Sequence, residues 1–126
     1  MVEFKPFDKQ YLAYLMARDK YDYAEKPCDD VICGVTVYVD GVRAGIAFAR
    51  DRDGMTTLDG YAEYSGKDHL KYAVIAGKHV LDMLCDKPVY IVYQRKRHKI
   101  GVLARALGFH VVACGEKYIL WRKDGR

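Results

Sequence analysis

The sequence predicts an α+β domain built on one mixed sheet, with elements in the order β-α-β-β-β-α-β-α-β-β. Short runs rich in β-branched and aromatic residues, separated by turn residues, fill residues 31–64. A helical apolar period then replaces the strand pattern, and a buried-strand run follows Pro88. Because a long helix between two strands imposes parallel pairing, we expect Val89–Tyr93 to run parallel to Met55–Tyr64.

The composition fits one domain, residues 1–126, since 51% of the 126 residues are apolar and 30% are charged. The chain has no apolar run of the length that a membrane span needs. Its first ten residues carry charged side chains where a signal peptide would have its apolar segment. We therefore expect a cytoplasmic protein without a membrane partner. Four cysteines without CxxC or paired Cys/His spacing predict no metal site and no disulfide framework, but reduced and mostly buried thiols.

The first elements are a strand at Val2–Lys5, which Pro6 ends, and a helix that Asp8 caps. An Asp side chain before an apolar helical period accepts a hydrogen bond from the first turn, which is why it predicts a helix start. The apolar residues of one helix face are Tyr11, Leu12, Leu15 and Met16.

Three antiparallel strands are expected next. Val31–Val39 and Val42–Arg50 flank Asp40-Gly41, a dipeptide typical of two-residue hairpins. The turn at residues 51–54 leads to the third strand, Met55–Tyr64. These segments predict a meander.

A long central helix follows, with Asp68 or Ser65 as its cap. Its buried stripe consists of Leu70, Val74, Gly77, Leu81 and Leu84. Because Gly77 belongs to this stripe, we expect it to face the sheet, where a larger side chain would push the helix outward.

The last third combines a buried strand, a helix and a hairpin. After Val89–Tyr93, a helix that Gly108 ends precedes two strands, Phe109–Cys114 and Tyr118–Arg122, around Gly115. The helix residues expected to point inward are Ile100, Leu103 and Leu107.

Charge is distributed unevenly along the chain. Residues 1–86 carry 11 Lys and Arg against 15 Asp and Glu, whereas residues 87–126 carry 10 against 2. This basic third indicates an anionic partner, either a phosphate-bearing cofactor or nucleic acid, or else a solvated helix start. The candidate anion-binding or nucleic-acid-binding residues are Arg95, Lys96, Arg97, His98, Lys99 and Arg105.

The element order, together with the segment Leu103–Phe109 (LARALGF), resembles the GNAT (Gcn5-related N-acetyltransferase) superfamily over nearly the whole chain. In that family a helix carrying an Asn and a Tyr runs into Leu-Gly-Phe and the next strand. Here those two positions fall on Arg97 and Ala104. The short loop after the third meander strand and the basic helix start also look like compact phage-encoded GNAT-like proteins, which would place the protein in the host cytoplasm or the virion.

The resemblance implies acyl transfer from acyl-coenzyme A, with acetyl-coenzyme A as cofactor, to an amine whose identity is unknown. It places the cofactor pyrophosphate at the turn of residues 64–69, although Asp68 would repel an anion there. The expected cofactor-binding residues are Ser65, Gly66, Lys67, His69 and Arg97.

The resemblance also suggests catalytic residues. Glu63, at the end of the strand before the cofactor turn, would accept the amine proton, and Tyr64 or Tyr93 would replace the tyrosine that Ala104 lacks as proton donor. The alternatives are an exposed strand-end Glu and tyrosines that only pack. Two other functions stay open: a non-catalytic GNAT-fold protein that binds nucleic acid or another protein, and acyl transfer onto a nucleobase.

Overall fold

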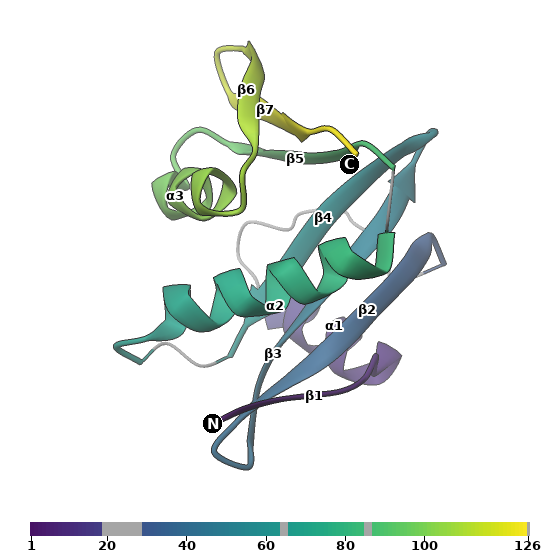
Figure 1. The fold of residues 1–126 in the computed structure, drawn as a ribbon, viewed down its shortest axis with the longest axis vertical. Coiled ribbons are helices and arrows are strands. Elements are labelled where there is room, and N and C mark those ends of the chain that lie inside the picture. Colours follow the sequence, from purple (N-terminus) through teal and green to yellow (C-terminus); the bar gives the residue numbers. More distant parts are fainter. Residues whose placement is uncertain (19–28, 64–65, 85–86, 126) are drawn as a thin grey trace.

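A computed structural model describes residues 1–18, 29–63, 66–84 and 87–125 (Figure 1). Within them, seven strands form one mixed sheet in the order β1-β2-β3-β4-β5-β7-β6, accompanied by three helices. The α+β class and the predicted element order are confirmed. The elements are β1 (Val2–Pro6), α1 (Lys9–Arg18), β2 (Val31–Val39), β3 (Val42–Arg52), β4 (Met55–Ala62), α2 (His69–Leu84), β5 (Val89–Gln94), α3 (His98–Ala106), β6 (His110–Cys114) and β7 (Tyr118–Lys123).

The predicted meander forms β2, β3 and β4, which pair antiparallel. Asp40 and Gly41 both have positive φ, 51° and 80°, as a two-residue hairpin turn requires. β4 ends at Ala62, two residues earlier than predicted, so Glu63 lies just beyond the strand.

β4 and β5 are parallel, as predicted, and share a single register pair among the described residues, Thr57 with Tyr90. Thr57 is the third residue of β4 and Tyr90 is the second residue of β5. Since the pairing lies near the amino ends, the strands separate toward their carboxyl ends (Figure 1). This splay at the centre of the sheet, which the GNAT resemblance implies, positions the candidate site.

The helices cover the two faces of the sheet unequally. In Figure 1, α2 lies in front of β2–β4 and α1 lies behind them. The predicted cap of α1 is confirmed, because the Tyr11 N–H donates to Asp8 Oδ1 at 3.1 Å. Tyr11 and Leu12 of α1 pack with Ile46 and Phe48 of β3, while α2 and α3 pack on the larger core of the opposite face.

Gly77 of α2 is buried, but it faces α3 and not the sheet, so that prediction is wrong in its direction. A Cβ at Gly77 would lie 2.9 Å from Leu107 Cδ1, just after α3. The buried residues Val80 and Leu84 belong to the core shared with the sheet. The glycine therefore allows α2 and the end of α3 to approach closely.

The predicted stop of α3 is confirmed. Gly108 has a φ of 90°, and the Phe109 N–H donates to the Ala104 carbonyl at 3.0 Å, which closes the helix end. Of the residues expected inside, Leu107 is buried and Ile100 and Leu103 are half-buried. Ala104 is fully buried.

The cysteines follow the prediction only in part. Cys33 is half-buried, and burial raises the pKa of its thiol, while Cys114 is exposed on β6, contrary to the expectation. Cys28 and Cys85 lie outside the described residues. None of the described helices has the length and apolar character needed to cross a membrane.

Candidate active site

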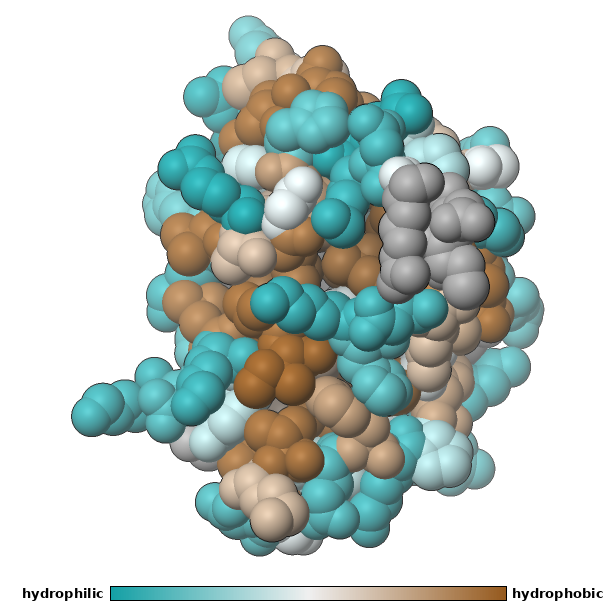
Figure 2. Space-filling model, viewed as in Figure 1, coloured by the Kyte–Doolittle hydropathy of each residue, from teal (hydrophilic) through white to brown (hydrophobic). Residues whose placement is uncertain are grey.

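The candidate site lies where β4 and β5 separate. The carboxyl end of β4 leads to Glu63 and the predicted cofactor turn, and the carboxyl end of β5 leads to the basic residues before α3. In open sheets, ligands bind outside the carboxyl ends of parallel strands, where neighbouring connections diverge. On the same side of the molecule, Figure 2 shows brown, apolar side chains over α2 and between α2 and α3, interrupted by teal, hydrophilic ones.

Glu63 is held in place by three contacts. Its N–H donates to the Ala44 carbonyl at 2.8 Å. The Tyr11 hydroxyl donates to Glu63 Oε1 at 2.7 Å, and Arg18 Nη1 lies 3.3 Å from Oε2. These contacts fix the carboxylate. Because the Glu63 side chain is still 29% exposed, the carboxylate is also accessible.

Tyr11 is the buried partner of Glu63. Its side chain comes from α1, is 2% exposed, and has the Arg43 guanidinium 3.7 Å from its ring centroid. Burial, and then the hydrogen bond to Glu63, raise the pKa of Tyr11 well above its usual range. Tyr11 therefore stays protonated and donates to Glu63.

Sequence reasoning did not find Tyr11, Arg18 or Arg43 as parts of this site. Tyr11 lies on the inward face of α1, as predicted. The helical period of apolar residues, however, gives no information about the partner of its hydroxyl, which is 52 residues away in the chain. Arg18 is the last residue of α1, where a basic side chain is common because it interacts favourably with the helix dipole. Its position therefore did not indicate a contact with Glu63.

Tyr93 lies in the core and not at the strand end. It is 7% exposed, and its oxygen accepts a hydrogen bond from Trp121 Nε1 at 3.1 Å. A Cβ at Gly101 of α3 would lie 2.6 Å from this hydroxyl, so Tyr93 occupies the space that Gly101 leaves. Its role as a proton donor stays a prediction, and Tyr64 lies outside the described residues.

The predicted cofactor turn is described from Gly66 onward, and Ser65 lies outside the described residues. The His69 N–H donates to the Gly66 carbonyl at 3.2 Å, which turns the chain into α2. Lys67 is exposed and His69 is half-buried. Because α2 has no acid in its first turn, its free N–H groups and Lys67 offer positive potential to an anion, against the single charge of Asp68 before the helix.

The basic cluster surrounds the start of α3. Arg95 Nη1 donates to the Gly115 carbonyl at 3.1 Å, which ties the end of β5 to the β6–β7 turn. Arg97 is the half-buried N-cap residue of α3 and makes no side-chain cap bond. The remaining members, all exposed, are Lys96, His98, Lys99 and Arg105.

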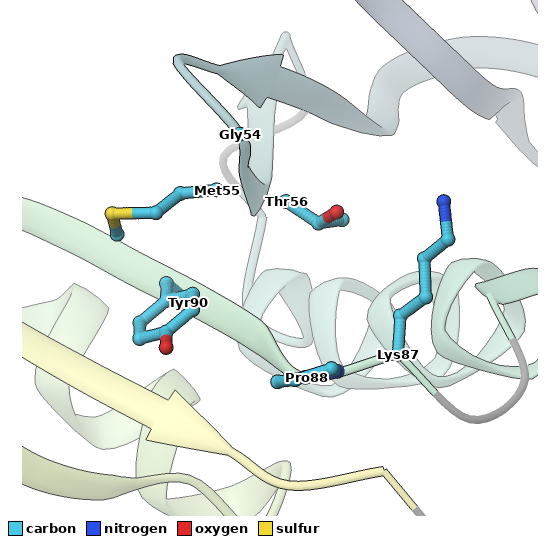
Figure 3. A pocket seen from close by; sticks show the side chains of 6 residues that line it. All are labelled: Gly54, Met55, Thr56, Lys87, Pro88 and Tyr90. Carbon is cyan, nitrogen blue, oxygen red and sulfur yellow. The ribbon is translucent and has the colours of Figure 1, made fainter.

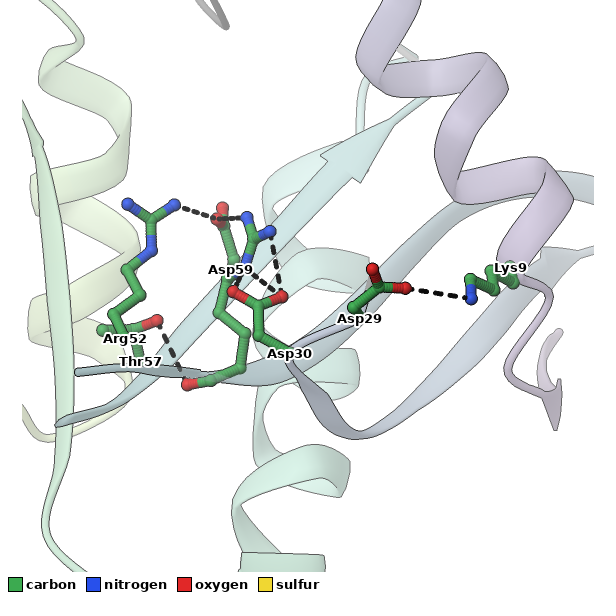
Figure 4. Close-up of polar contacts among 7 residues, drawn as sticks. Lys9, Asp29, Asp30, Arg52, Thr57 and Asp59 are labelled. Carbon is green, nitrogen blue, oxygen red and sulfur yellow. Dashed lines mark hydrogen bonds and ion pairs between the residues drawn. The ribbon is translucent and has the colours of Figure 1, made fainter. Parts of the chain in front are cut away.

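A buried arginine lies on the α1 face of the sheet. Arg50 of β3 is 1% exposed, and its Nε lies 3.1 Å from both carboxylate oxygens of Asp30 (Figure 4). Asp59 Oδ2 of β4 lies 3.9 Å from Arg50 Nη1 and 3.8 Å from Arg52 Nη2. This network joins β3 and β4 near the end away from Glu63. Among the described residues, no group of acids, histidines and cysteines could hold a metal ion.

No protein-family model and no curated protein sequence matches the chain. Solved structures do match it. Over 98% of this chain and 94% of that one, it is similar to the ribosomal-protein-S18-alanine N-acetyltransferase from Escherichia coli, with 13% identity and a TM-score of 0.73. A GNAT superfamily phosphinothricin acetyltransferase from Sinorhizobium meliloti, in complex with AcCoA, matches over 98% and 88%, with 13% identity and a TM-score of 0.72. An acetyltransferase from Bacillus subtilis in complex with CoA matches over 98% and 97%, with 11% identity and a TM-score of 0.68.

The chain therefore has the fold of the GNAT acetyltransferases over nearly its whole length, as the sequence resemblance implied. At these identities the likeness establishes the fold. The narrower resemblance to compact phage-encoded proteins stays a prediction.

Proposed function

We propose that this protein is a GNAT-type N-acyltransferase that takes an acyl group from acyl-coenzyme A, with acetyl-coenzyme A as the first candidate, and transfers it to an amine. The observation that carries the proposal is the single register pair between β4 and β5, with a fixed carboxylate just beyond β4. The coenzyme in the complexes of the similar Sinorhizobium meliloti and Bacillus subtilis proteins supports this choice of acyl donor.

The residues present fit an acyl-coenzyme A. The amino end of α2, with Gly66, Lys67 and His69, would hold its pyrophosphate, together with Ser65 and, from the start of α3, Arg97. The bound coenzyme would supply an acyl group activated as a thioester.

The chain's own groups would handle the protons. Glu63 would accept the proton that the amine loses as its nitrogen bonds to the acyl carbon and the carbon–sulfur bond breaks. Tyr11 and Arg18 would orient Glu63, since each binds a different carboxylate oxygen. Tyr64 or Tyr93 would return a proton to the departing thiolate.

A second function, a non-catalytic GNAT-fold binding protein, is favoured by Ala104. This fully buried alanine occupies the position where the resemblance places a tyrosine, and it cannot donate a proton. The two functions differ in one measurable property, turnover of an acyl thioester.

The test combines binding and turnover. Acetyl-coenzyme A should raise the unfolding temperature, because a ligand at 100 times its Kd stabilises the native state by about 2.7 kcal/mol. Release of free coenzyme A thiol should then be measured against a panel of amines. Glu63→Gln should lower the rate about 100-fold or more, whereas Glu3→Gln, an exposed acid on β1, should leave it unchanged.

Each outcome separates the two functions. Binding with turnover that depends on Glu63 supports the proposed reaction. Turnover that survives Glu63→Gln within a few-fold removes Glu63 as the base. Absence of both binding and turnover in the wild-type protein supports the non-catalytic function.

A further inference from the structure

The Glu63 carboxylate faces the α1 side of the sheet. Its two side-chain partners, Tyr11 and Arg18, both belong to α1. The proposed pyrophosphate site, at the amino end of α2, lies on the other side, because α1 and α2 pack against opposite faces of the sheet (Figure 1). Under the proposed function, the thioester therefore approaches from the α2 side, and the acceptor amine meets Glu63 from the α1 side.

A bulge in β3 brings a second arginine to the same place. The register between β2 and β3 skips Ala44, which is an extra residue between the paired Arg43 and Gly45. Because strand residues alternate between faces, this extra residue turns Arg43 from the face of Gly45 to the α1 face. The Ala44 carbonyl also accepts the Glu63 N–H at 2.8 Å. The bulge therefore holds Glu63 and directs Arg43 to the α1 side at one point of the sheet.

The Arg43 guanidinium lies near Glu63 but does not pair with it. It is 3.7 Å from the ring centroid of Tyr11, whose hydroxyl donates to Glu63 Oε1, so one tyrosine side chain connects the two groups. Arg43 is exposed, and no carboxylate of the described residues pairs with it, whereas Arg18 pairs with Glu63 Oε2. The planar fork of N–H donors in a guanidinium fits the two oxygens of a carboxylate. Arg43 is therefore a cation that a ligand at Glu63 can reach.

The charges around Glu63 favour one class of amine. The guanidinium groups of Arg18 and Arg43 lie near one carboxylate, so the described residues give this region a net positive charge. An alkyl amine without other charged groups is protonated at neutral pH, and this cation would add to the excess. An amine that also carries a carboxylate has no net charge, and its carboxylate can bind Arg43 while its nitrogen lies at Glu63.

The pocket at the opposite end of β4 is too far from Glu63 to hold this acceptor. It has a volume of about 310 Å³ and lies between the turn at Gly54, the start of β4 and the start of β5 (Figure 3). Since β4 has eight residues and a strand rises about 3.3 Å per residue, about 26 Å separate the pocket from Glu63. Lys87, an exposed cation in the pocket wall, therefore provides a control position.

We propose that the acceptor is a small amine that also carries a carboxylate, such as a free amino acid, and that Arg43 binds this carboxylate. The inference rests on the proposed acyl transfer and names its acceptor class. In the reaction, the acceptor nitrogen bonds to the acyl carbon and gives its proton to Glu63. The carbon–sulfur bond breaks, its electron pair leaves on sulfur, and the thiolate takes up one proton. Arg43 binds the acceptor and exchanges no proton.

The first test compares each amino acid with its own uncharged amide. Release of coenzyme A thiol from acetyl-coenzyme A would be measured with glycine, β-alanine, leucine, phenylalanine and glutamate, each beside the amide of the carboxylate next to its amine. Arg43→Ala should raise the KM for the amino acid about 10-fold, the loss of one charge-assisted bond at an exposed site, and leave the KM for the amide unchanged. Because each amine is compared with itself, differences in amine pKa between acid and amide cancel. Lys87→Ala should change neither KM.

Two further variants separate binding of the carboxylate from support of Tyr11. Arg43→Gln keeps a side chain over the Tyr11 ring without the charge, and it should behave as Arg43→Ala does. Arg43→Lys keeps the charge without the planar fork, so its KM for the amino acid should lie between those of the wild type and Arg43→Ala. If Arg43 only supports Tyr11, its removal should lower kcat for the acid and the amide alike.

The second test does not need turnover. An NMR titration of the protein without acyl donor would give the Kd of the same amino acids and amides, including weak ones. The best amino acid should bind the wild type about 10-fold more tightly than it binds Arg43→Ala, and its amide should bind both proteins equally.

The outcomes for the acceptor class and for acyl transfer are distinct. Turnover that Arg43→Ala leaves unchanged, or lowers equally for acid and amide, overturns the inference and leaves the proposed function standing. Binding that needs both the carboxylate and Arg43, without turnover of any amine, supports Arg43 as the carboxylate site and rejects acyl transfer. A wild-type protein that neither binds nor acylates any of these amino acids overturns the inference.

Discussion

Replacing Tyr11 by Phe should remove its hydrogen bond to Glu63, and so lower the free energy of unfolding, without opening a large cavity. The change removes one buried hydroxyl, which donates to Glu63 Oε1 at 2.7 Å from a side chain 2% exposed. A hydrogen bond to a charged group contributes about 1.5–3 kcal/mol. We expect the lower end of this range, about 1.5 kcal/mol, because the carboxylate keeps Arg18 at 3.3 Å and 29% of its exposure.

A double-mutant cycle isolates this contact. The free energy of unfolding would be measured by urea denaturation for the wild type, Tyr11→Phe, Glu63→Ala and the double variant, because an alanine leaves no acceptor for the Tyr11 hydroxyl. A coupling energy of about 1.5 kcal/mol is expected between the two positions. Tyr38→Phe, a half-buried tyrosine of β2, provides the control cycle with Glu63→Ala and should show no coupling. Coupling below about 0.5 kcal/mol in the Tyr11 cycle would refute the reasoning.

The same contact predicts a dependence on alkaline pH. The pKa of Tyr11 is raised in the folded protein from its ordinary 10.0, first by burial and then by the bond to Glu63. The unfolded chain therefore releases this proton at a lower pH than the folded one, so the stability that Tyr11 contributes is complete below about pH 10 and is lost as the pH rises above it. The difference in unfolding free energy between wild type and Tyr11→Phe should shrink above pH 10. A constant difference from about pH 8 to 11 would contradict the prediction.

Three further substitutions test the packing that supports the site, each by its urea midpoint. Gly77→Leu should destabilise by about 1–3 kcal/mol, because even a Cβ there would lie 2.9 Å from Leu107 Cδ1, and an unchanged or higher midpoint would reject the close approach of α2 to α3. Gly108→Ala should cost about 1–2 kcal/mol, since its φ is 90°; Gly115→Ala, whose Cβ would meet its first neighbour at 3.7 Å, is the control. Arg50→Ala should cost about 3 kcal/mol, because it empties the space of a side chain that is 1% exposed and removes its ion pairs with Asp30 and Asp59, whereas Lys9→Ala, which breaks an exposed pair with Asp29, should cost less than about 1 kcal/mol. Equal losses for the last two variants would contradict the structural role of Arg50.

The arrangement of the four strands from β2 to β5 could be predicted because local chemistry determines it. Asp40-Gly41 accepts positive φ at both positions, which brings β2 and β3 together as neighbours. The helical period over α2 forces β5 to pair in parallel with β4. Both signals act over short distances in the chain, so they can be read without knowing the rest of the structure.

The position of β7 could not be predicted in the same way. The turn at Gly115 predicts that β6 and β7 pair, but either strand of such a hairpin could lie beside β5. The structure places β7 there, with Trp121 opposite Ile91 and against Tyr93. That choice depends on the side chains that fill the space under α3, which a period-two pattern does not describe.

The candidate site was predicted where it depends on strand ends and missed where it depends on contacts across the fold. Glu63 follows from the end of β4, whereas Tyr11 and Arg18 reach it from α1. Gly77 is buried as predicted, but the stripe was only partly correct. Three of its residues are half-buried, and the buried surface of α2 faces the sheet on one side and α3 on the other. Hydrophobic patterns indicate that a residue is inside, not which neighbour it meets there.

Ala104, at the position where the GNAT resemblance places a tyrosine, has a counterpart in the packing around Tyr93. Gly101 lacks a side chain on α3, and the Tyr93 hydroxyl, coming from β5, lies 2.6 Å from the place of its missing Cβ. The bond from Trp121 Nε1 uses an acceptor site of this hydroxyl, so its own proton remains available to another acceptor. A phenol thus reaches α3 from the strand instead of from the helix. Ala104 alone therefore does not remove tyrosine chemistry from this side of the sheet, and turnover by the wild-type protein is the measurement that decides between the two proposed functions.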